Sequence, residues 1–299
     1  MKNRFFAPES KCFCLSLVFL LAQGFSVSSF VSGAALGQSL RSESSYYDEA
    51  CRLKTQQQFR QALALVSEGL KAHPNSNRLL ILEGNIWWMV GELELSQKAL
   101  MKASRQGIDS MDLHWQLAHL YRAQGKDRQA LAEINRALAL SPDCIELYND
   151  RSSIYKDRGE HLNAANDCSK AISIMEGQHM PPASLFIMKD RRAGEYVKAG
   201  LYDRAIADLE YLLAHEKKNE GKRQNLIGEC LLAQGKLKAA LSRFDAAIKV
   251  SSLSLDARRN RLKVLTLLKD ADGAKRERKI IESIENDFSP FDSMKPGPH

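Results

Sequence analysis

Apolar side chains recur at helical spacing in pairs of segments along most of the chain, and the clearest pair lies in residues 111–144. Its first segment carries apolar residues at Trp115, Leu117, Leu120 and Tyr121. Its second segment carries them at Leu131, Ile134, Leu138 and Leu140. Steps of three and four residues place such side chains on one face of a helix. The pattern therefore predicts amphipathic helices that come in pairs.

These pairs repeat with a period of 34 residues. Pro74 closes the segment LVSEGLKAHP and Pro142 closes EINRALALSP, so the two prolines stand 68 residues, or two periods, apart. The frame divides the chain into seven predicted units: residues 43–76, 77–110, 111–144, 145–178, 186–219, 221–254 and 255–288. A period of this length indicates stacked helical repeats.

Small residues occupy fixed places in this frame. The eighth place is small in six units, at Ala50, Gly84, Ala118, Ser152, Ala193 and Gly228. The fifteenth place is glycine in five units, at Gly91, Gly125, Gly159, Gly200 and Gly235. The twentieth place is alanine in six units, at Ala62, Ala130, Ala164, Ala205, Ala240 and Ala274. We expect the small residues to let two helices approach closely, and the glycine to end the first helix with a left-handed turn.

The architecture expected from this frame is all-α. One helix pair cannot bury its apolar face alone, whereas seven stacked pairs share a continuous core. The fold expected is therefore an α-α superhelix, or α-solenoid, of about seven helix-turn-helix repeats. The segment 179–185 (HMPPASL) interrupts the period. Because prolines stop a helix, we expect a surface loop there; a hinge between residues 43–178 and 186–288 is the alternative.

The frame resembles the tetratricopeptide repeat over nearly all of the chain after residue 42. The units at 111–144 and 145–178 are most similar to the family pattern. The first and last units depart from it, with Gln57 and Lys269 where glycine is usual. The resemblance implies a solenoid whose first helices line a concave groove, and this groove would bind another protein or an extended peptide.

The N-terminal residues 1–34 are predicted to be a secretory signal peptide. Lys2, Arg4 and Lys11 precede an apolar run over residues 12–22, and small residues follow at 32–35, as in signal sequences cleaved after a small residue. Cleavage after residue 34, or as a weaker option after Gly24, would leave a secreted or periplasmic protein. An uncleaved membrane anchor, with the solenoid outside the cytoplasm, is the alternative. A buried helix is less well supported, because no charge interrupts residues 12–40.

Composition and charge agree with a folded helical protein. The 299 residues are 44% hydrophobic and 26% charged, and the aromatic content of 7% disfavours a β-sandwich or barrel. The net charge of +7 is not concentrated. Residues 255–288 are the most basic part, yet their nine basic residues stand among seven acidic ones. We therefore expect no nucleic-acid partner. The Pro-rich residues 289–299 are expected to be a disordered tail.

Catalytic and metal-binding motifs are absent from the sequence, with no G-x-S-x-G, H-E-x-x-H, G-K-[ST] or G-x-G-x-x-G. His114 and His119 are five residues apart, which does not align them on one helical face as metal ligands. We expect them to be exposed or to cap a helix, and we expect Asp208 to face solvent. The cysteines Cys51, Cys144, Cys168 and Cys230 form no paired motif and are expected to be free thiols. We expect no enzyme activity, no cofactor, no metal and no small-molecule substrate.

The resemblance assigns the groove to the second, fifth, ninth, twelfth and thirteenth places of each unit. The candidate binding residues selected from those places are Tyr47, Asn85, Trp88, Met89, Trp115, His119, Arg122, Asn149 and Lys156. Trp88, Met89 and Trp115 would hold an apolar side chain, while polar neighbours align a backbone or an acidic residue. The alternative is that Trp88 and Trp115 only pack together between units. The groove does not reproduce the Lys, Asn, Asn, Lys, Arg set of the chaperone-binding members of the family.

The function predicted from the sequence is a noncatalytic scaffold or adaptor that binds a protein or an extended peptide outside the cytoplasm. A membrane-anchored assembly factor, or an accessory subunit, that uses the same solenoid is the alternative. Either function depends on a few surface residues, because the repeat specifies only the scaffold.

Overall fold

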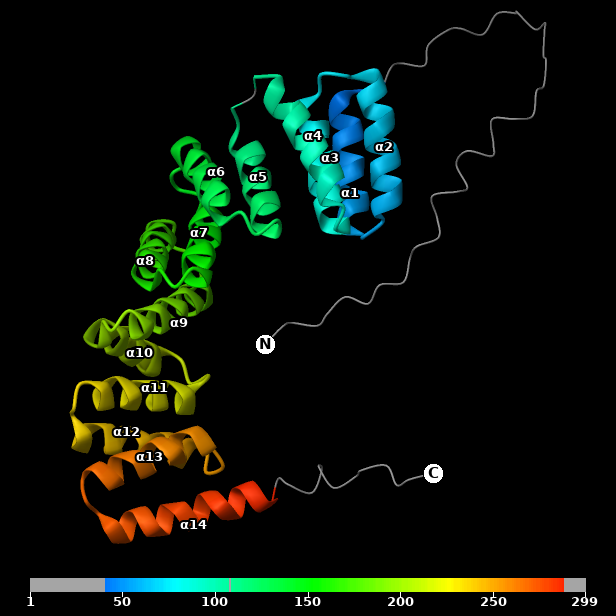
Figure 1. Ribbon diagram of the computed structural model, residues 1–299. Coiled ribbons are helices and arrows are strands. Elements are labelled where there is room, and N and C mark those ends of the chain that lie inside the picture. Colours follow the sequence, from blue (N-terminus) through cyan, green and yellow to red (C-terminus); the bar gives the residue numbers. More distant parts are fainter. Residues whose placement is uncertain (1–40, 108, 288–299) are drawn as a thin grey trace, which may run out of the picture. The chain divides into compact units, whose positions relative to one another are not determined.

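The computed structural model describes residues 41–107 and 109–287, and every regular element in these residues is an α-helix (Figure 1). The helices are α1 (Glu43–Thr55), α2 (Phe59–Ala72), α3 (Asn77–Val90), α4 (Leu93–Arg105), α5 (Met111–Ala123), α6 (Asp127–Leu140), α7 (Ile145–Asp157), α8 (His161–Gly177), α9 (Pro182–Lys198), α10 (Tyr202–His215), α11 (Glu220–Ala233), α12 (Leu237–Val250), α13 (Leu255–Leu267) and α14 (Ala271–Asp287). The predicted signal peptide or anchor and the predicted tail lie outside the described residues. The predicted all-α repeat fold is confirmed.

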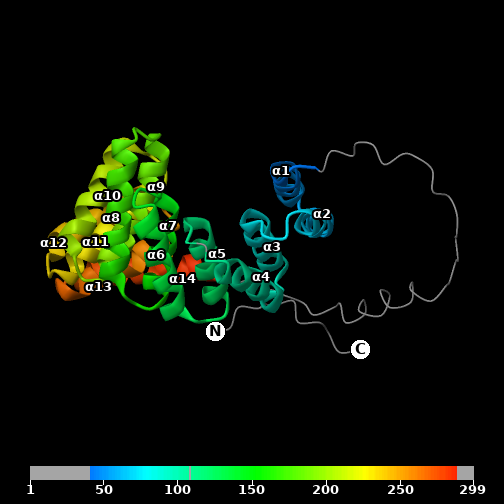
Figure 2. The same ribbon diagram turned by 90° about the horizontal axis from the view of Figure 1, so that it is seen from above.

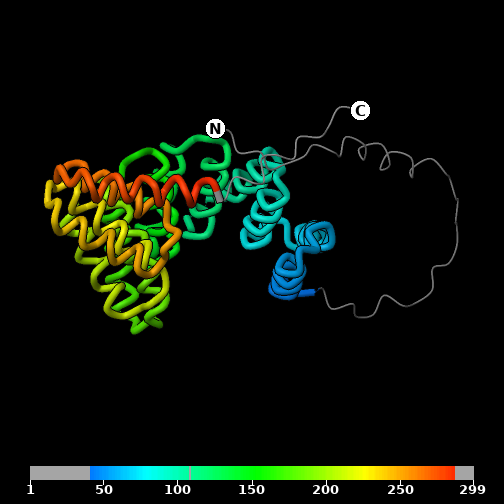
Figure 3. Tube along the Cα trace, turned by 90° about the horizontal axis from the view of Figure 1, so that it is seen from below, coloured from blue at the N-terminus to red at the C-terminus, as the bar shows by residue number. Residues whose placement is uncertain are grey.

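Each odd-numbered helix packs against the even-numbered helix that follows it, and each pair packs against the next pair. Figure 2 and Figure 3 show this succession of pairs from above and below. The core is shared between units. In the first apolar cluster, for example, Ala50 of α1, Val66 of α2 and Leu79 of α3 are all fully buried. The stacking therefore completes the burial that one pair could not achieve alone.

In four of the seven units, a serine side chain caps the N-terminus of the unit's first helix. Ser42, Ser76, Ser110 and Ser254 precede α1, α3, α5 and α13, and each hydroxyl oxygen accepts a hydrogen bond from the backbone N–H three residues later. Such a cap satisfies a donor that has no acceptor inside the helix and contributes about 1 kcal/mol. These helices begin at Glu43, Asn77, Met111 and Leu255, the residues at which the sequence frame begins those units.

The turn between the two helices of a unit requires a left-handed backbone at the fifteenth place. The φ angle there is positive in all seven units: Gln57 60°, Gly91 92°, Gly125 71°, Gly159 75°, Gly200 74°, Gly235 74° and Lys269 60°. Glycine adopts this conformation without the steric conflict that other residues meet. The glycine pattern thus reflects a geometry that the first and last units keep even without glycine.

Close helix crossings explain the small residues at the eighth place. A Cβ atom added to Gly84 would lie 2.5 Å from Cγ of Leu100, and one added to Gly228 would lie 2.4 Å from Cε1 of Phe244. Both neighbours are fully buried on the second helix of the same unit. No side chain fits between the helices at these points, because the interior is already close-packed.

The predicted seven-residue loop at 179–185 is wrong. Helix α9 begins at Pro182, four residues before the predicted start of its unit at Phe186, and α8 continues to Gly177. Pro182 occupies the first helical turn, where its missing N–H removes no hydrogen bond and its fixed φ suits the helix. Proline therefore begins a helix here where we expected it to interrupt one, and only residues 178–181 connect α8 to α9. The hinge stays a prediction.

Two polar residues expected at the surface are buried. His114 is only 7% exposed, and its ring nitrogens lie 2.6 Å from Oε2 of Glu133 and 2.7 Å from Oδ1 of Asp109. Asp208 is buried beneath the guanidinium of Arg192. Both expectations failed because they considered one helix at a time. A polar group can be buried when the packed neighbour supplies its hydrogen-bond partner.

The four cysteines in the described residues are free thiols, and Cys168 and Cys230 are buried. Burial raises the pKa of the Cys230 thiol to about 11, with the charge of Glu229 adding to the shift. This thiol is therefore protonated at neutral pH and behaves as a small apolar side chain. Over residues 41–107 and 109–287, no helix combines the length and the apolar character needed to cross a bilayer.

Candidate functional site

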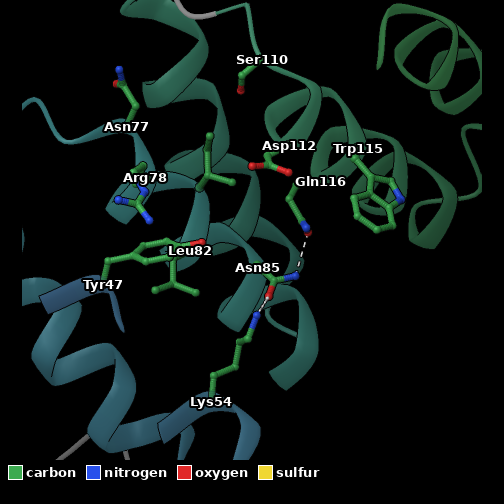
Figure 4. Close-up of a pocket in the computed structure, with 11 residues that line it drawn as sticks. Tyr47, Lys54, Asn77, Arg78, Leu82, Asn85, Ser110, Asp112, Trp115 and Gln116 are labelled. Carbon is green, nitrogen blue, oxygen red and sulfur yellow. Dashed lines mark hydrogen bonds between the residues drawn. The ribbon is translucent and has the colours of Figure 1, made fainter. Parts of the chain in front are cut away.

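The first three units together form a pocket of about 270 Å³ on the face built by α1, α3 and α5 (Figure 4). We call it the groove pocket. Its lining residues are Tyr47 and Lys54 from α1, Asn77, Arg78, Ile81, Leu82 and Asn85 from α3, and Ser110, Asp112, Trp115 and Gln116 at or within α5. Every helix that lines it is a first helix, so the packing of successive units creates the pocket.

A chain of hydrogen bonds crosses one side of the groove pocket and joins the three units. The ammonium of Lys54 donates to Oδ1 of Asn85 at 3.0 Å, and Nδ2 of Asn85 donates to Oε1 of Gln116 at 2.8 Å (Figure 4). These bonds fix the orientation of the Asn85 amide. A fixed amide with further hydrogen-bonding capacity is suited to a peptide backbone.

A cationic and aromatic wall faces this chain of hydrogen bonds. The guanidinium carbon of Arg78 lies 4.1 Å from the centre of the Tyr47 ring, a cation–π arrangement. Burial raises the pKa of the Tyr47 phenol, Cys51 adds to the shift, and the charge of Arg78 opposes it. The phenol is therefore neutral over the physiological range and offers an apolar ring with a polar tip.

An aromatic cluster of Trp88, Trp115 and His119 lies next to the groove pocket and shares Trp115 with it. The His119 ring centre is 5.3 Å from that of Trp88 and 5.7 Å from that of Trp115. Nε1 of Trp115 donates to Oδ2 of Asp150 at 2.6 Å, and Nε2 of His119 lies 3.2 Å from the same oxygen. These contacts stabilise the junction between α3, α5 and α7, with His119 in contact with both tryptophans. They leave the binding hypothesis and its packing alternative untested.

Asp150 is the anion at the centre of these contacts. Burial alone would raise the pKa of its carboxyl group, but hydrogen bonds from His119 and Trp115, together with the positive charges of His119 and Arg122, hold the pKa below the usual 3.8. A carboxyl group whose pKa falls on folding stabilises the folded state above its unfolded pKa, and this contribution is lost as the pH falls through the folded value.

We therefore predict that Asp150→Asn lowers the free energy of unfolding at neutral pH by about 1 to 2 kcal/mol, since charged hydrogen bonds are lost. The difference in unfolding free energy between variant and wild type should shrink as the pH falls below 3.8, because the wild-type carboxylate becomes protonated and loses its charge. Urea unfolding at neutral and acidic pH measures it. Asp143→Asn, at an exposed residue between α6 and α7, is the control. An Asp150→Asn deficit that does not change with pH would contradict this account.

The structure brings some of the sequence-predicted residues together and separates others. Tyr47, Asn85 and Trp115 line the groove pocket. Trp88 and His119 belong to the adjacent aromatic cluster. The others lie outside both: Met89 is 45% exposed, Arg122 is paired with Asp157 at 2.7 Å, and Lys156 is exposed. The side-chain oxygen of Asn149 is buried and has no hydrogen-bond partner among the described residues.

Sequence reasoning missed several residues of the groove pocket. Arg78 and Asp112 occupy the second place of their units, which the resemblance already assigns to the groove, so the same frame could have found them. Leu82 and Gln116 occupy the sixth place, for which the frame gave no signal. In residues 41–107 and 109–287, no group of three or more His, Cys, Asp or Glu side chains is arranged to hold a metal ion.

Two family models for the tetratricopeptide repeat match the chain, at residues 112–144 and 191–249. Together they cover less than half of it. Among curated proteins, none matches the chain in sequence. The matched stretches contain tetratricopeptide repeats.

The C-terminal part of a TPR repeat-containing protein from Cytophaga hutchinsonii is 15% identical, with a TM-score of 0.64 over 83% of this chain and 99% of that chain. A chain in the structure of Naa15/Naa10 bound to HypK-THB is also 15% identical, with a TM-score of 0.62 over 81% of this chain and 36% of that one. The APC/C hetero-tetramer Cut9-Hcn1 is 15% identical, with a TM-score of 0.49 over 76% and 43%. The chain thus spans less than half of the last two chains. The first two likenesses show the fold alone, an all-α helical repeat superhelix.

Proposed function

We propose that the protein is a noncatalytic scaffold that holds another protein, as an extended peptide segment, in the groove pocket. Its fold is typical of protein–protein interaction scaffolds, and proteins of this fold are generally noncatalytic. One of the solved structures with this fold is the Naa15/Naa10 complex bound to HypK-THB. The likeness supports a scaffold and does not identify a partner.

The observation that carries the proposal is the fixed Asn85 amide between Lys54 and Gln116. It stands in a pocket that combines this amide with apolar surface from Ile81 and Leu82. An extended peptide needs both, because its backbone requires hydrogen-bond partners and its side chains supply the buried apolar area. A further acceptor, Oδ1 of Asn77, is buried without a partner in the described part of the chain.

The location proposed for this function is outside the cytoplasm. Residues 1–34 support it through their basic start, apolar run and small-residue end, all read from the sequence. If they form a cleaved signal peptide, the mature N-terminus should lie between Phe25 and Gln38. A protein that starts at Met1 and remains with the membranes would instead support the anchored form, which is the second proposal for this segment.

Asn85→Ala and Tyr47→Ala should each weaken partner binding by about 2 kcal/mol, or about thirtyfold, if these residues are binding hot spots. The partner would be captured by affinity purification of the full chain from the native envelope or medium, and Kd measured by isothermal titration calorimetry. Gln129→Ala, at an exposed residue of α6 outside the groove pocket, is the matched control. Melting curves separate loss of binding from loss of folding. Unchanged affinity in an Asn85→Ala, Tyr47→Ala double variant would place the binding site elsewhere.

A further inference from the structure

Two cations of the groove pocket are without an acidic partner among the described residues. The guanidinium of Arg78 lies over the Tyr47 ring, and the ammonium of Lys54 donates to the neutral amide oxygen of Asn85. The neighbouring groove is different, since Arg122 on α5 is ion-paired with Asp157 on α7 at 2.7 Å. Neither cation of the groove pocket is therefore ion-paired within the described residues, whereas the cation beside it is.

The surroundings of each cation favour the binding of an anionic group next to it. Lys54 is half-buried, and a cation that has lost part of its hydration gains most from an acidic partner. The Tyr47 ring stacks against Arg78, which restricts the planar guanidinium before any ligand arrives. A guanidinium held in this way can bind both oxygens of a carboxylate at once.

Asp112 limits how much negative charge the groove pocket accepts. It is the pocket's own carboxylate, on α5, and within the described structure no ion pair joins it to Arg78 or Lys54. One acidic group can bind on the cationic side, whereas a second acidic group close by would be repelled by Asp112. A chain end with two adjacent carboxylates therefore fits less well than a single acidic side chain.

We infer that the groove pocket recognises an internal peptide segment with one acidic side chain, held by Arg78, beside an apolar side chain that contacts Ile81 and Leu82. This inference rests on the proposed function and adds the chemistry of the partner. The carboxylate supplies the ionic partner that Arg78 lacks among the described residues. The peptide backbone continues past Asn85 and Gln116, whose amides are fixed to each other.

The probe is a library of short random peptides displayed as internal segments, selected against the full chain and against Arg78→Glu. With the wild type we expect a single Asp or Glu beside an apolar residue in the enriched peptides. With Arg78→Glu we expect that acidic residue to be lost or replaced by Lys or Arg. Arg128→Glu makes the same charge change at an exposed residue of α6 and should leave the selection unchanged.

The enriched peptide is then synthesised, and its Kd is measured by fluorescence anisotropy. Arg78→Glu should weaken binding at least about tenfold, and added salt should reduce this difference, since the contact is electrostatic. Replacing the peptide's acid by its amide should have a similar effect on the wild type and little on Arg78→Glu. Moving the carboxylate to a free C-terminus should weaken binding.

Three results would overturn the inference. The first is a set of enriched peptides in which Asp and Glu are no more frequent than in the starting library. This would support peptide binding but contradict the preference for an acidic side chain. The second is an acidic preference that survives Arg78→Glu, which would place the anion elsewhere. The third is the absence of any enriched peptide, which would also contradict the proposed function.

Discussion

Arg192→Met should lower the free energy of unfolding by about 3 to 5 kcal/mol, because it leaves the Asp208 carboxylate buried without its ionic partner. In the wild type, Nε and Nη2 of Arg192 donate to the two carboxylate oxygens of Asp208 at 2.8 and 2.6 Å. The two side chains are 17% and 8% exposed. Urea unfolding, followed by far-UV circular dichroism, measures the loss.

A surface ion pair provides the comparison for this prediction. Arg243 and Glu210 are paired but considerably more exposed, so Arg243→Met should cost about 1 kcal/mol or less. The double variant Arg192→Met, Asp208→Leu should recover much of the loss, since it removes the buried charge itself. Equal losses of unfolding free energy in Arg192→Met and Arg243→Met would show that the burial of an ion pair does not determine the cost of breaking it.

The same kind of pair recurs at the twenty-third place of several units. Buried carboxylates stand there at Glu133, Asp167, Asp208 and Glu277, and their partners on the first helix are His114, Arg151, Arg192 and Arg261. Each pair links the two helices of one unit. Because a repeat array depends on the stability of its units and of their interfaces, we expect the loss of one pair to weaken mainly the unit that contains it.

Gly228→Ala should lower the free energy of unfolding by about 1 to 3 kcal/mol, although alanine is the better helix former. The added Cβ would lie 2.4 Å from Cε1 of Phe244. That ring is fully buried and cannot move aside without disturbing α12. The overpacking therefore exceeds the gain of about 0.5 to 1 kcal/mol that replacing a helical glycine normally brings. Thermal or urea unfolding measures the change.

Gly194→Ala is the matched control, because Gly194 also lies inside a helix, α9, but an added Cβ there would meet no atom within 4 Å. It should stabilise the protein by about 0.5 to 1 kcal/mol. Adding Phe244→Leu to Gly228→Ala should restore part of the stability by making room for the methyl group. The same response of the two glycines to alanine would mean that the helix crossing is less tightly packed than the structure shows.

The sequence by itself determined the fold class and the frame of the repeats. Helix periodicity and small residues act within one helix or between the two helices of one unit, so their effects can be read from local spacing. The left-handed turn is an example, since glycine marks it in five units and the frame locates it at Gln57 and Lys269 as well. The groove places also located Tyr47, Asn85 and Trp115 of the groove pocket.

The tertiary structure alone decided which of these side chains remain free to bind. Lys54 meets Asn85, Trp115 meets Asp150 and Arg122 meets Asp157, and each contact joins residues that lie about one period apart. Such contacts depend on how closely one unit packs on the next, which no single helix encodes. The start of α9 at Pro182 and the burial of Asp208 follow the same rule. A proline or a carboxylate is tolerated where the neighbouring chain meets its hydrogen-bonding needs, and only the packed structure places that neighbour.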